Sequence, residues 1–239
     1  MVGARTRIQS HAVVSGHVTL GTDNVIGPGA VLGDLPQDLS FDPQCTSFVH
    51  IGDHNVIREH CTIHRGTKPG SATVLGSRNL LMVGAHLGHN VEVGDAAILA
   101  NHVLLGGYAR VGDRAFLGGG AVVHQFTRVG QVAILQGLAG VSKDVPPFAV
   151  AAGLNRVVAL NVIGLKRAGF SLALRSAAKR AFTLFYHSGL NATQARAEAS
   201  KQAWPSEILP FWEFVAASLR GICAFGAWSR IKDNDEGER

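Results

Sequence analysis

Aliphatic residues recur at every sixth position over most of the first 141 residues of this chain. Stepping in sixes from Val2 meets an aliphatic residue each time up to Leu32. A second register starts at Ile51 and continues to Val141, with a single break at Pro69. Amphipathic helices repeat every 3.6 residues and half-buried strands every two, so neither accounts for this period.

The composition of each six-residue unit predicts short strands that alternate with tight turns. A large aliphatic residue is often followed by glycine, and a small or β-branched residue stands four positions after the large one. Three such strands close a triangular coil of eighteen residues, and coils stack at about the 4.8 Å spacing of strands in a sheet. We therefore expect a mainly β fold, a parallel β-helix that buries its own core, over residues 1–152.

Beyond residue 152 the apolar spacing becomes helical. Pro146 and Pro147 cannot donate the backbone hydrogen bonds of a central strand, so the β-helix is expected to end there. Residues 153–239 are expected to form a C-terminal helical domain whose tail, "KDNDEGER", is frayed. The residues that predict its helices are Leu174, Ala178, Ala181, Phe182 and Phe185 after an N-cap at Ser171, a capping box of Asn191 and Gln194, and a stripe of Ile208, Trp212, Val215 and Leu219.

Composition narrows the function classes. The net charge of +5 is a modest basic bias, compatible with an acidic partner or an anionic ligand. Aromatic residues are scarce in the first 150 positions, which argues against nucleic-acid binding. Three widely spaced cysteines predict no disulfide framework and favour the cytoplasm. No apolar segment is long and uninterrupted enough to predict a signal peptide or a membrane span.

Two histidines three positions apart, His86 and His89, interrupt the aliphatic repeat. Residues eighteen apart share a face of adjacent coils, so His89 should lie near Gly107 and then Gln125, with His124 beside it. An imidazole can take the proton of an attacking hydroxyl or amine, because it titrates near neutral pH. An exposed amide N–H such as that of Gly107 can stabilise a tetrahedral oxyanion. This set therefore suits acyl transfer.

Two other readings of the histidines remain open. Most of the eleven histidines are expected to be ordinary turn or surface residues, including His11, His17, His50, His54, His60, His64 and His102. A zinc site between subunits is suggested by His50 and His86, which are 36 positions or two coils apart. No third histidine follows at a matching short spacing and no cysteine joins them, so we expect no metal.

Seven motifs in order carry a resemblance to a known family. They are "PQDLSF" (36–41), "NVIREHCTIHRGT" (55–67), "NLLMVGAHLGHNVEVG" (79–94), "ILANHVLLGGY" (98–108), "VVHQFTRVG" (122–130), "VSKDVPPFAV" (141–150) and "NVIGLKRAGF" (161–170). From about residue 10 to 190 the chain resembles the UDP-N-acetylglucosamine acyltransferases that start lipid A synthesis. The resemblance implies that the β-helix is left-handed, and that the chain forms a homotrimer with active sites between neighbouring prisms.

The resemblance also implies a role for individual residues. His89 matches the general base that deprotonates the 3-position of the sugar, and Gly107 matches the oxyanion-stabilising amide. Asp38 matches a carboxylate that holds the acceptor sugar, and Gly137 matches the position that limits acyl length. Asn161 and Arg167 match groups that hold the nucleotide. The residues that match the lining of the sugar and acyl pocket are His86, Tyr108, His124 and Gln125.

The donor implied by the resemblance is an acyl thioester on the phosphopantetheine of acyl carrier protein, with no further cofactor. The acidic carrier would suit a basic cluster formed by Lys166, Arg167, Arg175, Lys179 and Arg180. The same cluster is also what an ordinary solvated helix face would show. The acceptor would be a nucleotide sugar such as UDP-N-acetylglucosamine.

Four positions depart from the family pattern, and three of them concern the acceptor. Ser40 replaces a lysine, Tyr108 replaces a histidine, and Ile163 replaces a glutamate on the nucleoside side. Asn90 replaces the acid that follows the catalytic histidine. The acceptor could thus be a 3-amino analogue or another nucleotide sugar. A short-chain acyl- or acetyl-CoA-dependent sugar transferase, and a non-catalytic scaffold or carrier-binding module, are the alternatives.

Overall fold

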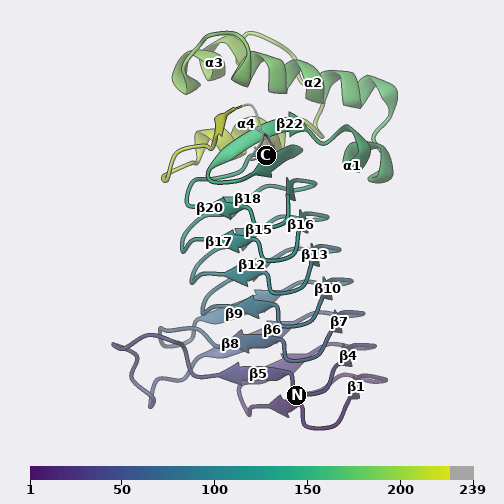
Figure 1. The fold of residues 1–239 in the computed structure, drawn as a ribbon, viewed down its shortest axis with the longest axis vertical. Coiled ribbons are helices and arrows are strands. Elements are labelled where there is room, and N and C mark those ends of the chain that lie inside the picture. The colour runs from purple at the N-terminus through teal and green to yellow at the C-terminus, as the bar shows by residue number, and fades with distance from the viewer. Residues whose placement is uncertain (227–239) are drawn as a thin grey trace, which may run out of the picture.

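The computed structural model describes residues 1–226, which coil into a three-sided parallel β-helix with helices stacked on its C-terminal end (Figure 1). Sheet A forms one side from β3 (Val18–Leu20), β6 (Phe48–Ile51), β9 (Ala72–Leu75), β12 (Glu92–Val93), β15 (Arg110–Val111) and β18 (Arg128–Val129). Sheet C forms another from β2 (Val13–Val14), β5 (Val31–Asp34), β8 (Thr62–His64), β11 (His86–Leu87), β14 (Leu104–Leu105), β17 (Val122–Val123) and β20 (Gly140–Val141).

Sheet B forms the third side and continues into the C-terminal part. Its strands in spatial order are β1 (Arg7–Ile8), β4 (Val25–Ile26), β7 (Val56–Ile57), β10 (Leu80–Leu81), β13 (Ile98–Leu99), β16 (Phe116–Leu117), β19 (Ile134–Leu135), β21 (Ala149–Ala152), β22 (Arg156–Leu160) and β23 (Ala224–Phe225). All pairs are parallel up to β21, and β22 then pairs with β21 in the antiparallel sense.

The predicted period of eighteen is the register of the regular coils. His86 pairs with Leu104, and Leu104 pairs with Val122. Two coils are longer, because residues 35–47 and 65–71 are loops that leave the prism between sheets C and A. Across the second loop Phe48 pairs with Ala72, a step of 24 rather than eighteen. The first of these loops projects from the lower left of the β-helix in Figure 1.

The repeat of large and small residues fills the interior as predicted. Leu81 and Leu87 are fully buried, as are the small partners Ala85 and Ala97. Each coil covers the side chains of the coil before it, and a fully buried leucine contributes about 1.5–3 kcal/mol. The first coil has no coil below it, so Ile8 remains 44% exposed although it belongs to the repeat.

The turns at the corner between sheets C and A share an unusual backbone conformation. Asn90, Tyr108 and Phe126 follow one another at intervals of eighteen and have φ of 59°, 60° and 63°. Asparagine tolerates this left-handed region better than most residues, whereas tyrosine and phenylalanine adopt it only where the surrounding coil imposes it. Successive coils therefore place the side chains of these three residues in one column.

Four helices follow the β-helix, in the part where helical spacing was predicted. They are α1 (Val162–Arg167), α2 (Leu172–Tyr186), α3 (Ala192–Ala199) and α4 (Leu209–Ala216). The predicted N-cap Ser171 accepts from Leu174 N, and Asn191 with Gln194 forms the predicted capping box of α3. The stripe that predicted α4 is wrong at Leu219, which lies beyond the helix and is 98% exposed. Strands β22 and β23 were not predicted, and the tail lies outside the described residues.

A buried ion pair fastens the segment after α4 to the β-helix. Asp144 is 1% exposed and accepts from Nε and Nη2 of Arg128 at 2.9 and 2.7 Å. The same carboxylate accepts from the hydroxyl of Ser218 at 2.8 Å, and Arg128 also donates to the carbonyl of Phe214. This network joins sheet A to residues more than seventy positions later in the chain.

Candidate functional site

His89 and Gly107 are in direct contact at the corner between sheets C and A. The imidazole of His89 lies against the Cα of Gly107, one coil further on, so that a Cβ at Gly107 would overlap Cε1 and Nε2 of the ring. The bare α-carbon is therefore what makes room for the histidine. The predicted pairing of these two residues is confirmed as a geometric fact, whereas their catalytic roles remain predictions.

The backbone N–H of Gly107 is available to a ligand. Its neighbours Gly106 and Tyr108 donate to the carbonyls of Val123 and His89, but in residues 1–226 no protein acceptor is paired with the Gly107 N–H. The Gly107 residue is also partly exposed. A free amide donor beside an imidazole is the arrangement that oxyanion stabilisation needs.

The carboxamide of Asn90 contacts the inner nitrogen of His89. Nδ1 of His89 lies 3.2 Å from Oδ1 of Asn90, and the same oxygen accepts from the N–H and hydroxyl of Thr67 at 2.9 and 3.0 Å. Tyr108 stands edge-on to the His89 ring at 5.3 Å and stacks on Phe126 at 4.9 Å. The outer nitrogen, Nε2, is the one that faces Gly107.

His86 is half-buried on β11 and is uncharged at neutral pH. Burial lowers the pKa of His86 to about 4, and the neighbouring His64 adds a smaller effect in the same direction. Its Nδ1 lies 2.7 Å from the hydroxyl of Thr62, and the ring of His64 stands edge-on at 5.0 Å. His86 can therefore offer a hydrogen bond to a sugar without carrying charge.

His64 is a site residue that the sequence did not single out. The prediction of a turn or surface position is wrong for His64, because it is only 7% exposed on β8. Burial lowers the pKa of His64, and its Nδ1 has no hydrogen-bond partner among residues 1–226. The sequence feature that could have placed His64 is the pairing of β8 with β11. The eighteen-residue count does not predict this pairing, because the length of the inserted loop between the two strands is not known from the sequence.

Asp38 lies in the first inserted loop, at the same corner as His89. Its carboxylate accepts from the N–H and the hydroxyl of Ser40 at 2.9 and 2.8 Å. These hydrogen bonds lower the pKa of Asp38, and the charge of His89 contributes a smaller effect. The loop is anchored by Arg65, which is 4% exposed and donates to the carbonyl of Cys45. Ser40, one of the departures, thus orients the carboxylate.

His124 and Gln125 occupy the same corner one coil above Gly107. Both are exposed, and the Nδ1 of His124 lies 3.1 Å from the carbonyl of Gln125. The structure therefore brings seven predicted residues to one corner of the prism. They are Asp38, His86, His89, Gly107 and Tyr108, with His124 and Gln125 in the coil above.

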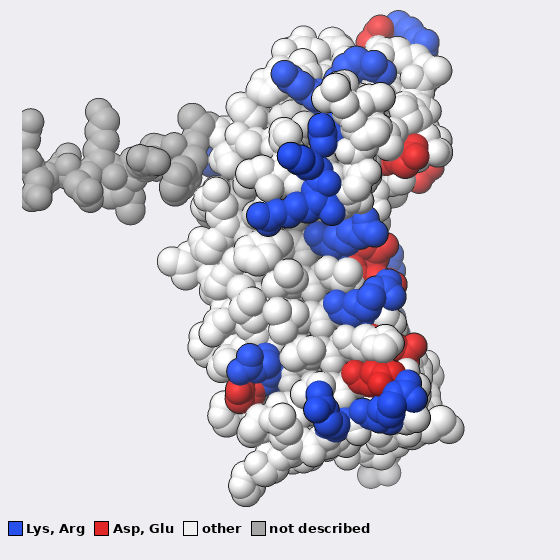
Figure 2. Space-filling model, turned by 90° about the vertical axis from the view of Figure 1, so that its right-hand side faces the viewer, with Lys and Arg blue, Asp and Glu red and all other residues white. Residues whose placement is uncertain are grey.

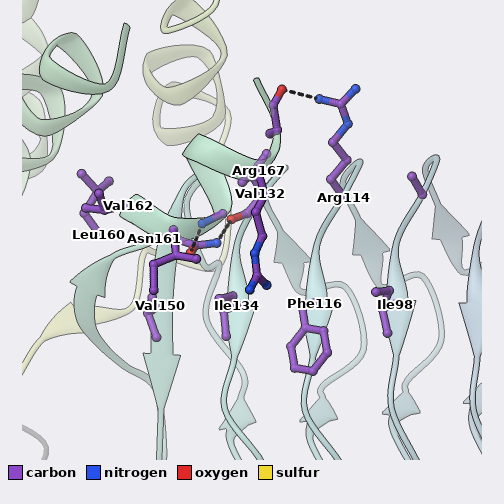
Figure 3. A pocket seen from close by; sticks show the side chains of 14 residues that line it. Ile98, Arg114, Phe116, Val132, Ile134, Val150, Leu160, Asn161, Val162 and Arg167 are labelled. Carbon is purple, nitrogen blue, oxygen red and sulfur yellow. Dashed lines mark hydrogen bonds between the residues drawn. The ribbon is translucent and has the colours of Figure 1, made fainter. Parts of the chain in front are cut away.

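Asn161 and Arg167 lie on another side of the prism, at a groove of about 830 Å³ over sheet B (Figure 3). Apolar side chains of Ile98, Phe116 and Ile134 form its floor, and α1 forms its wall. Arg167 is exposed at this groove, whereas Asn161 is 5% exposed.

The side chain of Asn161 has a structural task in the single chain. Its Oδ1 accepts from Gly164 N as the N-cap of α1, and its Nδ2 donates to the carbonyl of Val132 at 2.7 Å. These bonds fix α1 to the β-helix (Figure 3). Contact of Asn161 with a nucleotide remains a prediction.

Gly137 lies at the third corner, between sheets B and C. A Cβ there would touch only the carbonyl of Gly119, at an ordinary 3.4 Å, so a larger side chain would project outward from the corner. Gly137 is exposed and stands apart from the corner that carries His89. One chain alone therefore does not gather all the predicted residues.

The spacing argument for zinc is wrong. His50 lies on sheet A and pairs with Val74, whereas His86 lies on sheet C and pairs with Thr62. The second inserted loop breaks the eighteen-residue register between them. In the part of the chain that the structure describes, no three His, Cys, Asp or Glu side chains are grouped as metal ligands would be. Nor does any described helix combine the length and apolar character that crossing a membrane requires.

Comparison with known proteins identifies the family. A model of UDP-N-acetylglucosamine O-acyltransferase domain 2 matches residues 144–223. The crystal structure of LpxA, a UDP-N-acetylglucosamine acyltransferase from Bacteroides fragilis, is 36% identical with a TM-score of 0.88, covering 92% of this chain and 87% of the other. The chain belongs to the UDP-N-acetylglucosamine acyltransferase family.

Other relatives agree. The Francisella novicida acyltransferase is 34% identical with a TM-score of 0.89, covering 94% of this chain and 83% of its own. The Moraxella catarrhalis O-acyltransferase is 35% identical with a TM-score of 0.86, covering 93% and 87%. These matches confirm the left-handed parallel β-helix with C-terminal helices.

Proposed function

We propose that this chain transfers an acyl chain, 3-hydroxylated in the favoured case, from acyl carrier protein to the 3-position of a UDP-N-acetylglucosamine-like nucleotide sugar. The observation that carries the proposal is the contact between the His89 imidazole and Gly107, whose N–H is unpaired within residues 1–226. Membership of the acyltransferase family supports the reaction class. In lipid A synthesis this would be the first acyl transfer.

His89 would act as general base through Nε2. The 3-hydroxyl or 3-amino group of the sugar gives its proton to Nε2 as it attacks the thioester carbonyl, and a new C–O or C–N bond forms. The carbonyl electron pair moves onto oxygen, where the N–H of Gly107 stabilises it. Collapse breaks the C–S bond, the phosphopantetheine thiolate takes the proton from His89, and the histidine returns to its neutral form. General-base help contributes about 10²–10⁴-fold and one oxyanion donor about 10²–10³-fold.

The outer surfaces of the prism favour a homotrimer. The outward residues of sheet B are apolar along almost its whole length, as Val56, Ile98 and Ile134 show, and those of sheet C include Leu104 and Val122. Sheet A instead presents charged residues such as Glu92 and Arg110. Two different apolar sides per copy suit a closed ring in which sheet B of one copy covers sheet C of the next.

Such a ring would complete the site. The corner between sheets C and A, with His89, would meet the edge of sheet B of the next copy, where Arg167 lines the apolar groove. The corner with Gly137 would point toward the ring axis. Arginine suits a diphosphate by its charge and its two parallel donors. The two groups of residues that one chain separates would thus face one substrate between two chains.

The basic cluster is proposed to receive the carrier. Its members Lys166, Arg167 and Lys179 are exposed, and none of the five cations forms an ion pair with the described residues. Figure 2 shows basic side chains gathered toward the helical end of this side of the molecule. An acidic carrier protein would be attracted to such a surface. We place the reaction in the cytoplasm, where the three free cysteines stay reduced.

Two of the positions that depart from the family pattern affect which acceptor the site can bind. Ser40 orients Asp38 but carries no charge for a phosphate, and Ile163 is 67% exposed at the groove without a polar group for a nucleoside. The test is therefore a turnover assay that combines acyl carriers of several chain lengths and acetyl-CoA with UDP-N-acetylglucosamine and its 3-amino analogue. We expect turnover with a carrier-bound acyl chain and one of these sugars.

Turnover with acetyl-CoA alone would replace the donor assignment by a short-chain one. Binding of carrier without turnover of any pair would support the non-catalytic module instead. A native mass other than three chains would contradict the intersubunit site. Each of these outcomes concerns a different part of the proposal, so the assay and the mass measurement are made on the same preparation.

A further inference from the structure

The hydrogen bonds around Asn90 determine which ring nitrogen of His89 carries the proton. The Thr67 N–H can only donate, and it lies 2.9 Å from the side-chain atom of Asn90 that faces the ring, so that atom must be the carboxamide oxygen. A carboxamide oxygen carries no hydrogen, so it cannot donate to a histidine nitrogen. The Nδ1 of His89, 3.2 Å from the same oxygen, must therefore be the donor. The lone pair of the neutral ring is then on Nε2, facing Gly107.

Thr67 and Tyr108 support this arrangement through further hydrogen bonds. The Thr67 hydroxyl lies 3.0 Å from Oδ1 of Asn90 and 3.0 Å from the Tyr108 hydroxyl. If Thr67 donates to Asn90, its own oxygen accepts from Tyr108, and every group has a partner. The Tyr108 ring is held by stacking on Phe126 with an interplanar angle of 10°.

Asn90 is itself held firmly. It is 8% exposed, its N–H donates to the hydroxyl of Thr73 at 2.8 Å, and its φ of 59° suits asparagine. The ionisable groups that face His89 are Asp38 from the inserted loop, His64 from β8 and Tyr108 from the next coil. None of them contacts Nδ1, so the direct partner of the ring is neutral.

We propose that Asn90, Thr67 and Tyr108 are positioning residues that hold His89 as the Nδ1–H tautomer through an uncharged relay. The catalytic meaning of the relay rests on the proposed function, but the tautomer does not. In this family member the two departures at Asn90 and Tyr108 act together, because the tyrosine reaches Asn90 through Thr67. His89 keeps its orientation, but it lacks the neighbouring negative charge that a carboxylate at position 90 would supply.

The direct test reads the tautomer without any substrate. Long-range ¹H–¹⁵N correlation spectra of the full chain above the titration range of histidine distinguish protonated from unprotonated ring nitrogens, and His89→Gln assigns the signal. We expect a protonated Nδ1 and an unprotonated Nε2. In Tyr108→Phe and Thr67→Val, which keep shape and lose one hydroxyl, the pattern should become a mixture. An Nε2–H tautomer in the unsubstituted protein would overturn the proposal.

Kinetics then separate positioning from a structural effect. Tyr108→Phe should lower kcat by about 3- to 10-fold, the worth of one neutral hydrogen bond, while KM changes little. Thr67→Val removes two hydrogen bonds and should lower kcat by at least as much. Thr193→Val, an exposed residue on α3, is the matched control and should leave kcat unchanged. Equal loss in all three variants would mean general destabilisation and would contradict the relay.

Asn90→Asp gives a third and independent reading. A carboxylate beside Nδ1 stabilises the protonated imidazole, so the acidic limb of the kcat/KM profile should move to higher pH. An unmoved limb would contradict direct contact between residue 90 and the base. If the unsubstituted protein is inactive with every donor and acceptor, the proposed function fails while the spectra still decide the tautomer.

Discussion

Gly107→Ala is the substitution that tests the contact between base and amide most sharply. The added methyl would occupy the place of Cε1 and Nε2 of His89, and non-bonded carbon atoms need about 3.5–4.0 Å. The ring must therefore move by roughly 1 Å, a displacement that can cost on the order of 10²-fold in rate. The Gly107 N–H stays in place, so the loss would come from the base rather than from the oxyanion donor.

The fold should tolerate the change. Gly107 does not adopt the left-handed backbone conformation that would exclude alanine. Gly16 is the matched control, because it occupies the same position of the six-residue unit at the same corner, with open space around the site of a Cβ. We expect Gly16→Ala to keep activity and Gly107→Ala to lose about 10²-fold in kcat at an unchanged melting temperature.

The assay is single-turnover acyl transfer with the donor and acceptor found for the unsubstituted protein. Comparable kcat for the two alanine variants would refute the argument, because it would mean that the ring of His89 can leave Gly107 without consequence. A lowered melting temperature of Gly107→Ala alone would assign the loss to folding instead. The melting curve is therefore recorded on the same samples.

Three further predictions concern other parts of the molecule. Asp144→Ala leaves Arg128 without its buried partner and should lower the free energy of unfolding by about 3–5 kcal/mol, measured by denaturant titration. The pKa of His86 falls to about 4 on folding, so the free energy of unfolding should decrease as the pH falls from about 6.5 to about 4. His86→Gln should reduce this decrease by up to about 3 kcal/mol. An equally steep decrease in the variant would contradict the assignment to His86. Gly137→Met should shorten the preferred acyl chain, and an unchanged preference in a donor series would refute its assignment as the length limit.

The coiled architecture was predictable because its signal is repeated many times. The six-residue period gives the register, and the register alone places His89 against Gly107. The regular coils are tightly packed on one another, so residues eighteen positions apart in the sequence are in contact in the structure. The same count fails at His50, where an inserted loop of unknown course changes the number of residues in a coil.

Contacts made by side chains across several coils were not predictable. The relay from Tyr108 to Asn90 passes through Thr67, which lies 41 positions before the tyrosine and belongs to an inserted loop. His64 looked like a surface residue because nothing in its local sequence marks burial. Asn161 was singled out for a ligand, and its place as an N-cap appears only when α1 is packed on the β-helix.

In the proposed reaction, Nε2 of His89 takes a proton from the 3-position of a nucleotide sugar held between two copies of the chain. A crystal structure of the protein with UDP-N-acetylglucosamine or its 3-amino analogue tests it directly. We expect the 3-substituent within about 3.2 Å of Nε2, with Arg167 of an adjacent copy on the diphosphate. A sugar bound with its 3-position away from His89, or within a single chain, would contradict it.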